Sequence, residues 1–178
     1  MKALSPSVKS LAGGLDAIAF SDWYSCQIRT LDSGFPGADD LVQRLHALGI
    51  PMALATSSSA AMVQSKRQNH SEMFDRFRVI VTGDDADVKH GKPAPDIFLV
   101  AAKRLGIDAR RCLAFEDSPY GVQSAKAAGM QVVAIPDSSM DKQRFQEADR
   151  IIDSLVDFAW SDWKFAGPLM KPDSTNYN

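Results

Sequence analysis

Two hydrophobic patterns alternate along residues 35 to 153. Short apolar runs, typical of buried strands, occupy residues 50–55, 77–83, 112–115, 131–136 and 150–153. Between them, apolar residues recur every three to four positions, as on one face of a helix, at about residues 39–48, 60–68, 97–105, 119–128 and 141–148. Strands that alternate with helices in this way predict an α/β domain with a mainly parallel sheet covered on both faces.

The first 34 residues show no sustained period, because Ser, Gly and Pro are scattered through them. Only Ala17-Ile-Ala-Phe20 suggests a strand there. We therefore divide the chain into an atypical N-terminal segment (1–34), a core domain (35–158) and a C-terminal tail (159–178).

Composition excludes several classes of protein. A chain of 178 residues with 45% hydrophobic and 24% charged residues suits one globular domain. A net charge of −2 argues against a nucleic-acid partner. With two cysteines, Cys26 and Cys112, a disulfide framework is not expected. The apolar stretch at residues 11–20 is interrupted by two glycines and an aspartate, so it predicts neither a targeting segment nor a membrane span. We expect a cytoplasmic monomer without a membrane partner.

Two adjacent carboxylates, Glu116 and Asp117, directly follow the apolar run at residues 112–115. Open parallel sheets hold ligands at the carboxyl ends of their strands, and two hard oxygen donors suit Mg²⁺. The alternative is that both residues cap the helix that begins at about Pro119, because acidic residues favour helix N-termini.

Hydroxyl side chains and a lysine occupy two other predicted strand or helix ends. The run at residues 50–55 ends in Thr56, Ser57 and two further serines, whose hydroxyls and following helix-start amides can donate to an anion. The alternative is that these are turn and N-cap residues. Lys92 lies between Gly91 and Pro93, just ahead of a predicted helix. A cation opposes the macrodipole there, and a bound anion would offset this cost.

A hydroxyl donor, a fixed cation and a carboxylate pair on one rim of a sheet are the parts that hold a phosphoryl group with Mg²⁺. Three stretches that carry them, residues 53–58, residues 83–98 and residues 115–122, resemble the second, third and fourth motifs of the haloacid dehalogenase-like (HAD) hydrolases. The resemblance is to the branch of small-molecule phosphatases that includes pseudouridine-5′-phosphatase and plant glycerol-phosphatases. It implies a Rossmann-like three-layer sandwich.

The resemblance also implies roles for individual residues. Thr56 and the Ser57 amide would bind phosphate, Lys92 would contact the phosphate and the nucleophile, and Glu116 with Asp117 would hold Mg²⁺. The function that the resemblance implies is a Mg²⁺-dependent phosphatase that hydrolyses a small phosphomonoester, a nucleotide or sugar phosphate such as pseudouridine 5′-phosphate.

The chain departs from this family at its first motif, Asp-x-Asp-Gly-Thr, which supplies an aspartate nucleophile and an acid–base residue. No Asp-x-Asp precedes residue 53. Residues 17–20 would instead lead into Ser21 and Asp22, and Asp22 is a weak candidate nucleophile. The helical cap domain is also missing. The alternative function is therefore a catalytically impaired pseudoenzyme or truncated isoform that binds phosphate and Mg²⁺ without turnover. Because the first strand is central in this family, we predict that residues 15–20 fill its place.

Overall fold

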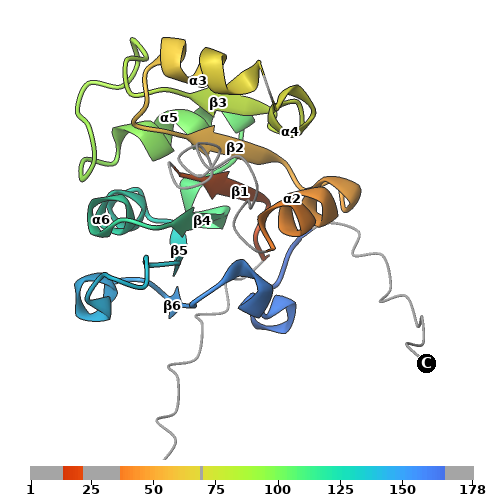
Figure 1. The fold of residues 1–178 in the computed structure, drawn as a ribbon, viewed down its shortest axis with the longest axis vertical. Coiled ribbons are helices and arrows are strands. Elements are labelled where there is room, and N and C mark those ends of the chain that lie inside the picture. The colour runs from red at the N-terminus through yellow and green to blue at the C-terminus, as the bar shows by residue number, and fades with distance from the viewer. Residues whose placement is uncertain (1–13, 22–36, 69, 167–178) are drawn as a thin grey trace, which may run out of the picture.

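Six parallel strands form the sheet of this protein, in the order β3-β2-β1-β4-β5-β6 (Figure 1). The computed structural model describes residues 14–21, 37–68 and 70–166. The strands are β1 (Ala17–Phe20), β2 (Met52–Ala55), β3 (Val79–Val81), β4 (Cys112–Glu116), β5 (Gln131–Ala134) and β6 (Arg150–Ile151). The helices are α2 (Ala38–Ala47), α3 (Ala60–Arg67), α4 (Ser71–Phe74), α5 (Asp96–Leu105) and α6 (Pro119–Ala127).

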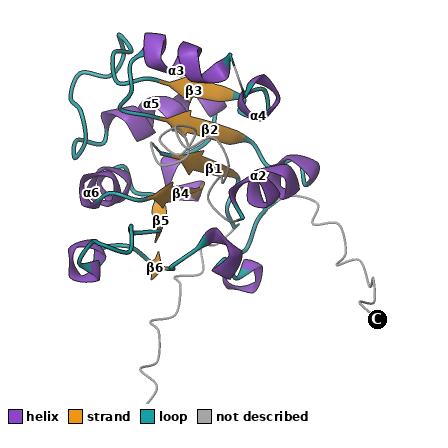
Figure 2. Cartoon of the chain, in the orientation of Figure 1, coloured by secondary structure: helices purple, strands orange, loops and turns teal. Residues whose placement is uncertain are grey.

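Helices cover both faces of this sheet, as Figure 2 shows. One apolar core packs α5 and α6 on one face. The other core packs α2 and the C-terminal residues 155–165 on the opposite face. This arrangement confirms the predicted α/β three-layer sandwich with a parallel sheet. A helical cap domain is not found within residues 14–21, 37–68 and 70–166.

Strand β1 lies in the middle of the sheet, between β2 and β4. Its four residues are all buried, and each pairs with a residue of β4. Because it is apolar on both sides, the segment suits a strand covered by helices on both faces. Phe20 stacks on Phe115, with ring centroids 5.2 Å apart. The prediction that residues 15–20 fill the central position is confirmed for Ala17–Phe20, whereas Leu15 forms an isolated bridge with Phe165.

The C-terminal segment fastens the start of β1. Leu15 donates its amide to the Lys164 carbonyl and accepts a hydrogen bond from the Ala166 amide, both at 2.7 Å. Trp163 and Phe165 are buried in the core on the α2 face. Residues 159–166, which we assigned to the tail, therefore pack on the core, whereas the division at residues 34 and 158 stays a prediction.

Two elements differ from the sequence prediction. The helix predicted at about residues 141–148 is a short 3₁₀ turn, Lys142–Phe145. Only Phe145 of this turn is buried, so it lacks the apolar stripe that stabilises a longer helix. Helix α4 was not predicted and has one buried residue, Phe74. No helix in the described ranges is long and apolar enough to cross a membrane.

Candidate functional site

Polar side chains gather where β2, β1 and β4 end. Among the described residues only four polar or charged residues are buried, and three of them, Ser21, Thr56 and Glu116, lie at these strand ends. The Ser21 amide donates to the Phe115 carbonyl at 3.2 Å, which fixes Ser21 just past the end of β1 and beside β4. Parallel strands place their carboxyl ends at one edge of the sheet, so these three side chains share one edge.

Lys92 spans this edge from one strand to another. Its Nζ donates to the Glu116 carboxylate of β4 at 2.9 Å and to the Ala55 carbonyl of β2 at 3.3 Å. Since β1 lies between these strands, the Lys92 ammonium lies near the end of β1, and Ser21 is the residue that follows β1. The Phe98 ring lies beneath Nζ at 5.1 Å and adds a cation–π contact. The structure therefore brings together the predicted cation and one predicted carboxylate.

Glu116 is fully buried beneath the start of α6. A Cβ atom on Gly121 would lie 1.9 Å from Glu116 Oε2, so only glycine lets the helix approach this closely. The N-cap of α6 is Ser118, whose Oγ accepts a hydrogen bond from the Gly121 amide at 3.0 Å. The cap is therefore a serine, which differs from the alternative in which Glu116 and Asp117 cap this helix. Asp117 is half-buried.

The turn after β2 positions Thr56 and Ser57. Thr56 is fully buried, and its Oγ1 accepts a hydrogen bond from the Ser58 amide at 3.1 Å. Ser57 is exposed at the edge. The loop after β3 packs closely on this turn, because a Cβ atom on Gly83 would lie 2.4 Å from the Ser57 carbonyl oxygen. By its contacts Thr56 is a turn residue. This position in the turn is compatible with the phosphate-binding role that we predict for it.

The start of α3 already has hydrogen-bond acceptors. The Ala60 amide donates to Asp84 Oδ1 at 2.9 Å, and the Met62 amide donates to the Ser59 hydroxyl at 3.4 Å. The Thr82 hydroxyl and the Ala60 amide lower the pKa of Asp84 below the usual range of an aspartate. The helix-start amides that we expected to donate to an anion are therefore satisfied in part by the protein itself.

The donor set at this edge does not fit a Mg²⁺ ion. Mg²⁺ takes six oxygen ligands in a strict octahedron and relies on carboxylates for charge. One carboxylate oxygen of Glu116 is paired with Lys92, and the residue at the end of the central strand, Ser21, is neutral. No group of three acidic, His or Cys side chains that could hold a metal occurs in the described part of the chain. The role predicted for Glu116 and Asp117 as metal ligands stays a prediction.

Two further features bear on the predicted site. Asp22, the weak candidate nucleophile, lies outside the described residues. Gly121 and Phe98, which shape the site, lie within the stretches at residues 115–122 and 83–98 that carry the resemblance. Their roles were not predicted, because both act through contacts between distant elements. Ser21 could be found only by taking residues 17–20 as the central strand.

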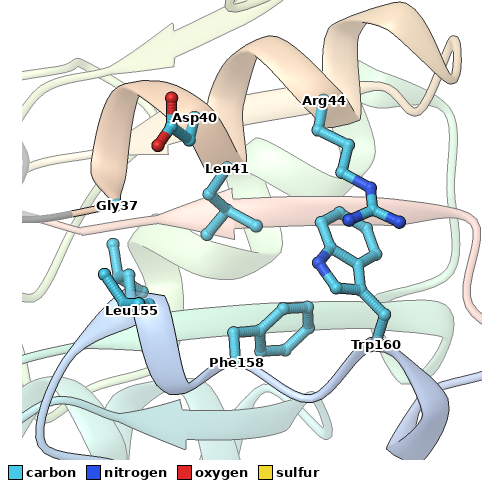
Figure 3. A pocket seen from close by; sticks show the side chains of 8 residues that line it. Gly37, Asp40, Leu41, Arg44, Leu155, Phe158 and Trp160 are labelled. Carbon is cyan, nitrogen blue, oxygen red and sulfur yellow. The ribbon is translucent and has the colours of Figure 1, made fainter. Parts of the chain in front are cut away.

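A separate pocket of about 200 Å³ lies between α2 and the segment at residues 155–160, and it holds none of the predicted site residues (Figure 3). Leu41, Phe158 and Trp160 point into it, and the Arg44 guanidinium lies over the Trp160 ring at 4.3 Å. This contact ties the C-terminal segment to α2.

Comparisons with known proteins match this chain to phosphatases. A family model of haloacid dehalogenase-like hydrolases matches residues 9–129. The chain is 46% identical over 131 residues to (DL)-glycerol-3-phosphatase 1, mitochondrial, of Arabidopsis thaliana. This match covers 72% of this chain and 44% of the Arabidopsis protein. It is 49% identical over 126 residues to the "Probable pseudouridine-5′-phosphatase" of Drosophila melanogaster, and this match covers 69% of this chain and 54% of the Drosophila protein. The chain thus spans about half the length of these curated relatives.

Solved structures agree with the sequence comparisons. A variant of CbbY from Rhodobacter sphaeroides, in complex with xylulose-(1,5)bisphosphate, superimposes with a TM-score of 0.66 at 30% identity and covers 74% of this chain and 59% of its own. The resemblance inferred from residues 53–58, 83–98 and 115–122 is therefore confirmed. The chain belongs to the haloacid dehalogenase-like hydrolase family.

Proposed function

We propose that this chain binds a small phosphorylated metabolite at the edge formed by β2, β1 and β4, and that it does not hydrolyse this ligand through an aspartyl phosphate at the end of β1. The observation that carries the proposal is Ser21, a neutral and fully buried residue between Thr56 and Glu116. The Thr56 and Ser57 groups would donate to phosphate oxygens, and Lys92 would supply positive charge.

Ser21 is poorly suited to replace a carboxylate nucleophile. A serine hydroxyl is a weak nucleophile until an adjacent base removes its proton. The Lys92 ammonium and the Glu116 carboxylate at this edge are bonded to each other. This pairing leaves neither of them placed as a dedicated base for Ser21. Phosphate recognition can therefore persist at this edge without turnover.

The class of ligand follows from the relatives. Their names give a glycerol phosphate and a pseudouridine phosphate as substrates, and CbbY was solved with a sugar bisphosphate. These names favour a sugar or nucleotide phosphate such as pseudouridine 5′-phosphate. A neutral Ser21 is compatible with retention of such a ligand, because it adds no negative charge beside the phosphate.

A second candidate is a Mg²⁺-dependent phosphomonoesterase, which the similarity to curated phosphatases favours. Its nucleophile would be Asp22. The two candidates differ in turnover, so one assay separates them.

The experiment measures phosphate release by the purified chain from glycerol 3-phosphate and pseudouridine 5′-phosphate, with and without Mg²⁺, beside the variant Asp22→Asn. We expect no release above that of the variant. Mg²⁺-dependent release that Asp22→Asn abolishes would establish the second candidate and overturn the first.

Binding is measured separately by calorimetric titration with inorganic phosphate. Thr56→Val removes the Thr56 hydroxyl at nearly constant side-chain size and should weaken binding by about tenfold, the usual effect of losing a hydrogen bond to a charged group. The control is Ser161→Ala, which removes an exposed hydroxyl of the C-terminal segment and should leave binding unchanged. Equal affinities for a folded Thr56→Val and the control would place the phosphate elsewhere.

A further inference from the structure

The Lys92–Glu116 pair is an interior ion pair. The Lys92 side chain is 6% exposed and the Glu116 side chain is not exposed at all. A charge at such depth needs a partner, because removing one member of a buried pair leaves the other desolvated and uncompensated. Lys92 Nζ and Glu116 Oε1 lie 2.9 Å apart, so each charge has the other as a partner. Glu116 therefore serves as the counter-ion that lets Lys92 remain charged at the strand ends.

The second carboxylate oxygen of Glu116 is also enclosed. The backbone of Gly121 lies against Oε2, since a Cβ atom there would approach to 1.9 Å. The Ser118 hydroxyl lies 3.5 Å from the same oxygen. A Mg²⁺ ion at about 2.1 Å from a carboxylate oxygen, with the water molecules it retains, needs open space that this oxygen lacks.

Ser21 lies at the remaining central position of the edge. It is fully buried, and its Oγ has no hydrogen-bond partner among the described residues. Side chains alternate along a strand, so Ser21 shares its face with Ala19, which belongs to the core under α5 and α6. A carboxylate at this position would face the ammonium of Lys92 and the edge that holds Asp117.

We propose that Ser21 keeps this edge from binding Mg²⁺ in the free protein. Glu116 is committed to Lys92, a neutral hydroxyl replaces the carboxylate that the central strand could offer, and Asp117 alone is an insufficient ligand. A carboxylate at position 21 would complete the set. The inference concerns the free chain and does not depend on phosphate binding, so either proposal can fail without the other.

The test measures metal binding by the full chain, with Mg²⁺ in calorimetry and with Mn²⁺ in electron paramagnetic resonance, where the signal of free Mn²⁺ reports the unbound ion. Wild type should show no saturable site tighter than about 1 mM. Ser21→Asp should bind at least about tenfold more tightly, because it adds a charged oxygen donor. Ser21→Asn, of similar size but neutral, should behave as wild type. Ser161→Asp adds a carboxylate on the exposed C-terminal segment and should also behave as wild type.

Circular dichroism and thermal unfolding verify that Ser21→Asp is folded. A folded Ser21→Asp that binds no more tightly than Ser21→Asn would overturn the proposal. Should Ser21→Asp not fold, wild type and Asp117→Asn decide between the outcomes. A saturable site in wild type that Asp117→Asn removes would overturn the proposal, and absence of a site in both proteins would support it.

Discussion

Replacing Lys92 with methionine would remove the positive charge that pairs with the buried Glu116 carboxylate. The two charged atoms lie 2.9 Å apart, so at an effective dielectric constant of about 20 their attraction is about 6 kcal/mol before desolvation is subtracted. Removing one partner of such a pair costs about 3–5 kcal/mol of unfolding free energy. In a chain of this length a loss of about 3 kcal/mol lowers Tm by about 6–12 °C.

The double variant Lys92→Met with Glu116→Gln tests this reasoning, because it removes both charges. We expect it to be more stable than Lys92→Met alone, with a coupling free energy of at least about 2 kcal/mol. The matched control is Lys142→Met, which breaks the exposed pair with Asp153 and should cost less than about 1 kcal/mol.

Urea unfolding followed by tryptophan fluorescence and far-ultraviolet circular dichroism gives these free energies. A cost for Lys92→Met no greater than that of Lys142→Met would refute the buried pair. Additive costs in the double variant would show that the two groups do not interact, and would remove the basis for treating Glu116 as a counter-ion.

Three other substitutions probe neighbouring features. Gly121→Ala should destabilise the protein by about 1–3 kcal/mol, because its Cβ would overlap the carboxylate beneath it, whereas Gly91→Ala, with no atom within 4 Å, should change stability by less than about 0.5 kcal/mol in urea unfolding. Ser21→Ala should be neutral or raise Tm by up to about 4 °C, because it removes a buried hydroxyl without a partner among the described residues; a large loss would show that this hydroxyl is bonded. The Thr82 hydroxyl and the Ala60 amide lower the pKa of the Asp84 carboxylate in the folded chain, so its stabilising effect is present above the pKa of the unfolded chain and is lost as the pH falls through the folded pKa. Asp84→Asn should therefore flatten the dependence of stability on pH between about pH 5 and pH 2, and an unchanged pH profile would rule out this contribution.

The core elements were predictable because local patterns and tertiary structure agree in them. The run at residues 112–115 and the periodic stretch at residues 119–128 became β4 and α6. Turn residues such as Gly49 and Gly129, which adopt positive φ in the structure, marked two helix ends. Prediction failed at residues 141–148, where a single buried aromatic residue, Phe145, holds a short turn without a helical stripe.

The candidate site was predictable in part. Order along the chain identified Thr56, Lys92 and Glu116, because each lies at the end of a strand, just after a strand or ahead of a helix. What those residues do to one another could not be read from spacing. The 2.9 Å contact between Lys92 and Glu116 joins residues 24 positions apart. From the sequence pattern this carboxylate was interpreted as either a metal ligand or a helix cap, and its contact with Lys92 was not predicted.

The sequence by itself determined the family, the alternation of strands and helices, and the absence of an Asp-x-Asp pair ahead of residue 53. The tertiary structure confirmed the place that the family resemblance predicts for Ala17–Phe20 in the middle of the sheet, and only that structure decided that Ser21 is buried between the polar ends of β2 and β4. The physical reason is that a four-residue apolar run carries almost no information about its place in a sheet. Its position is set by the unpaired backbone groups of the two neighbouring strands, which must be satisfied in the interior.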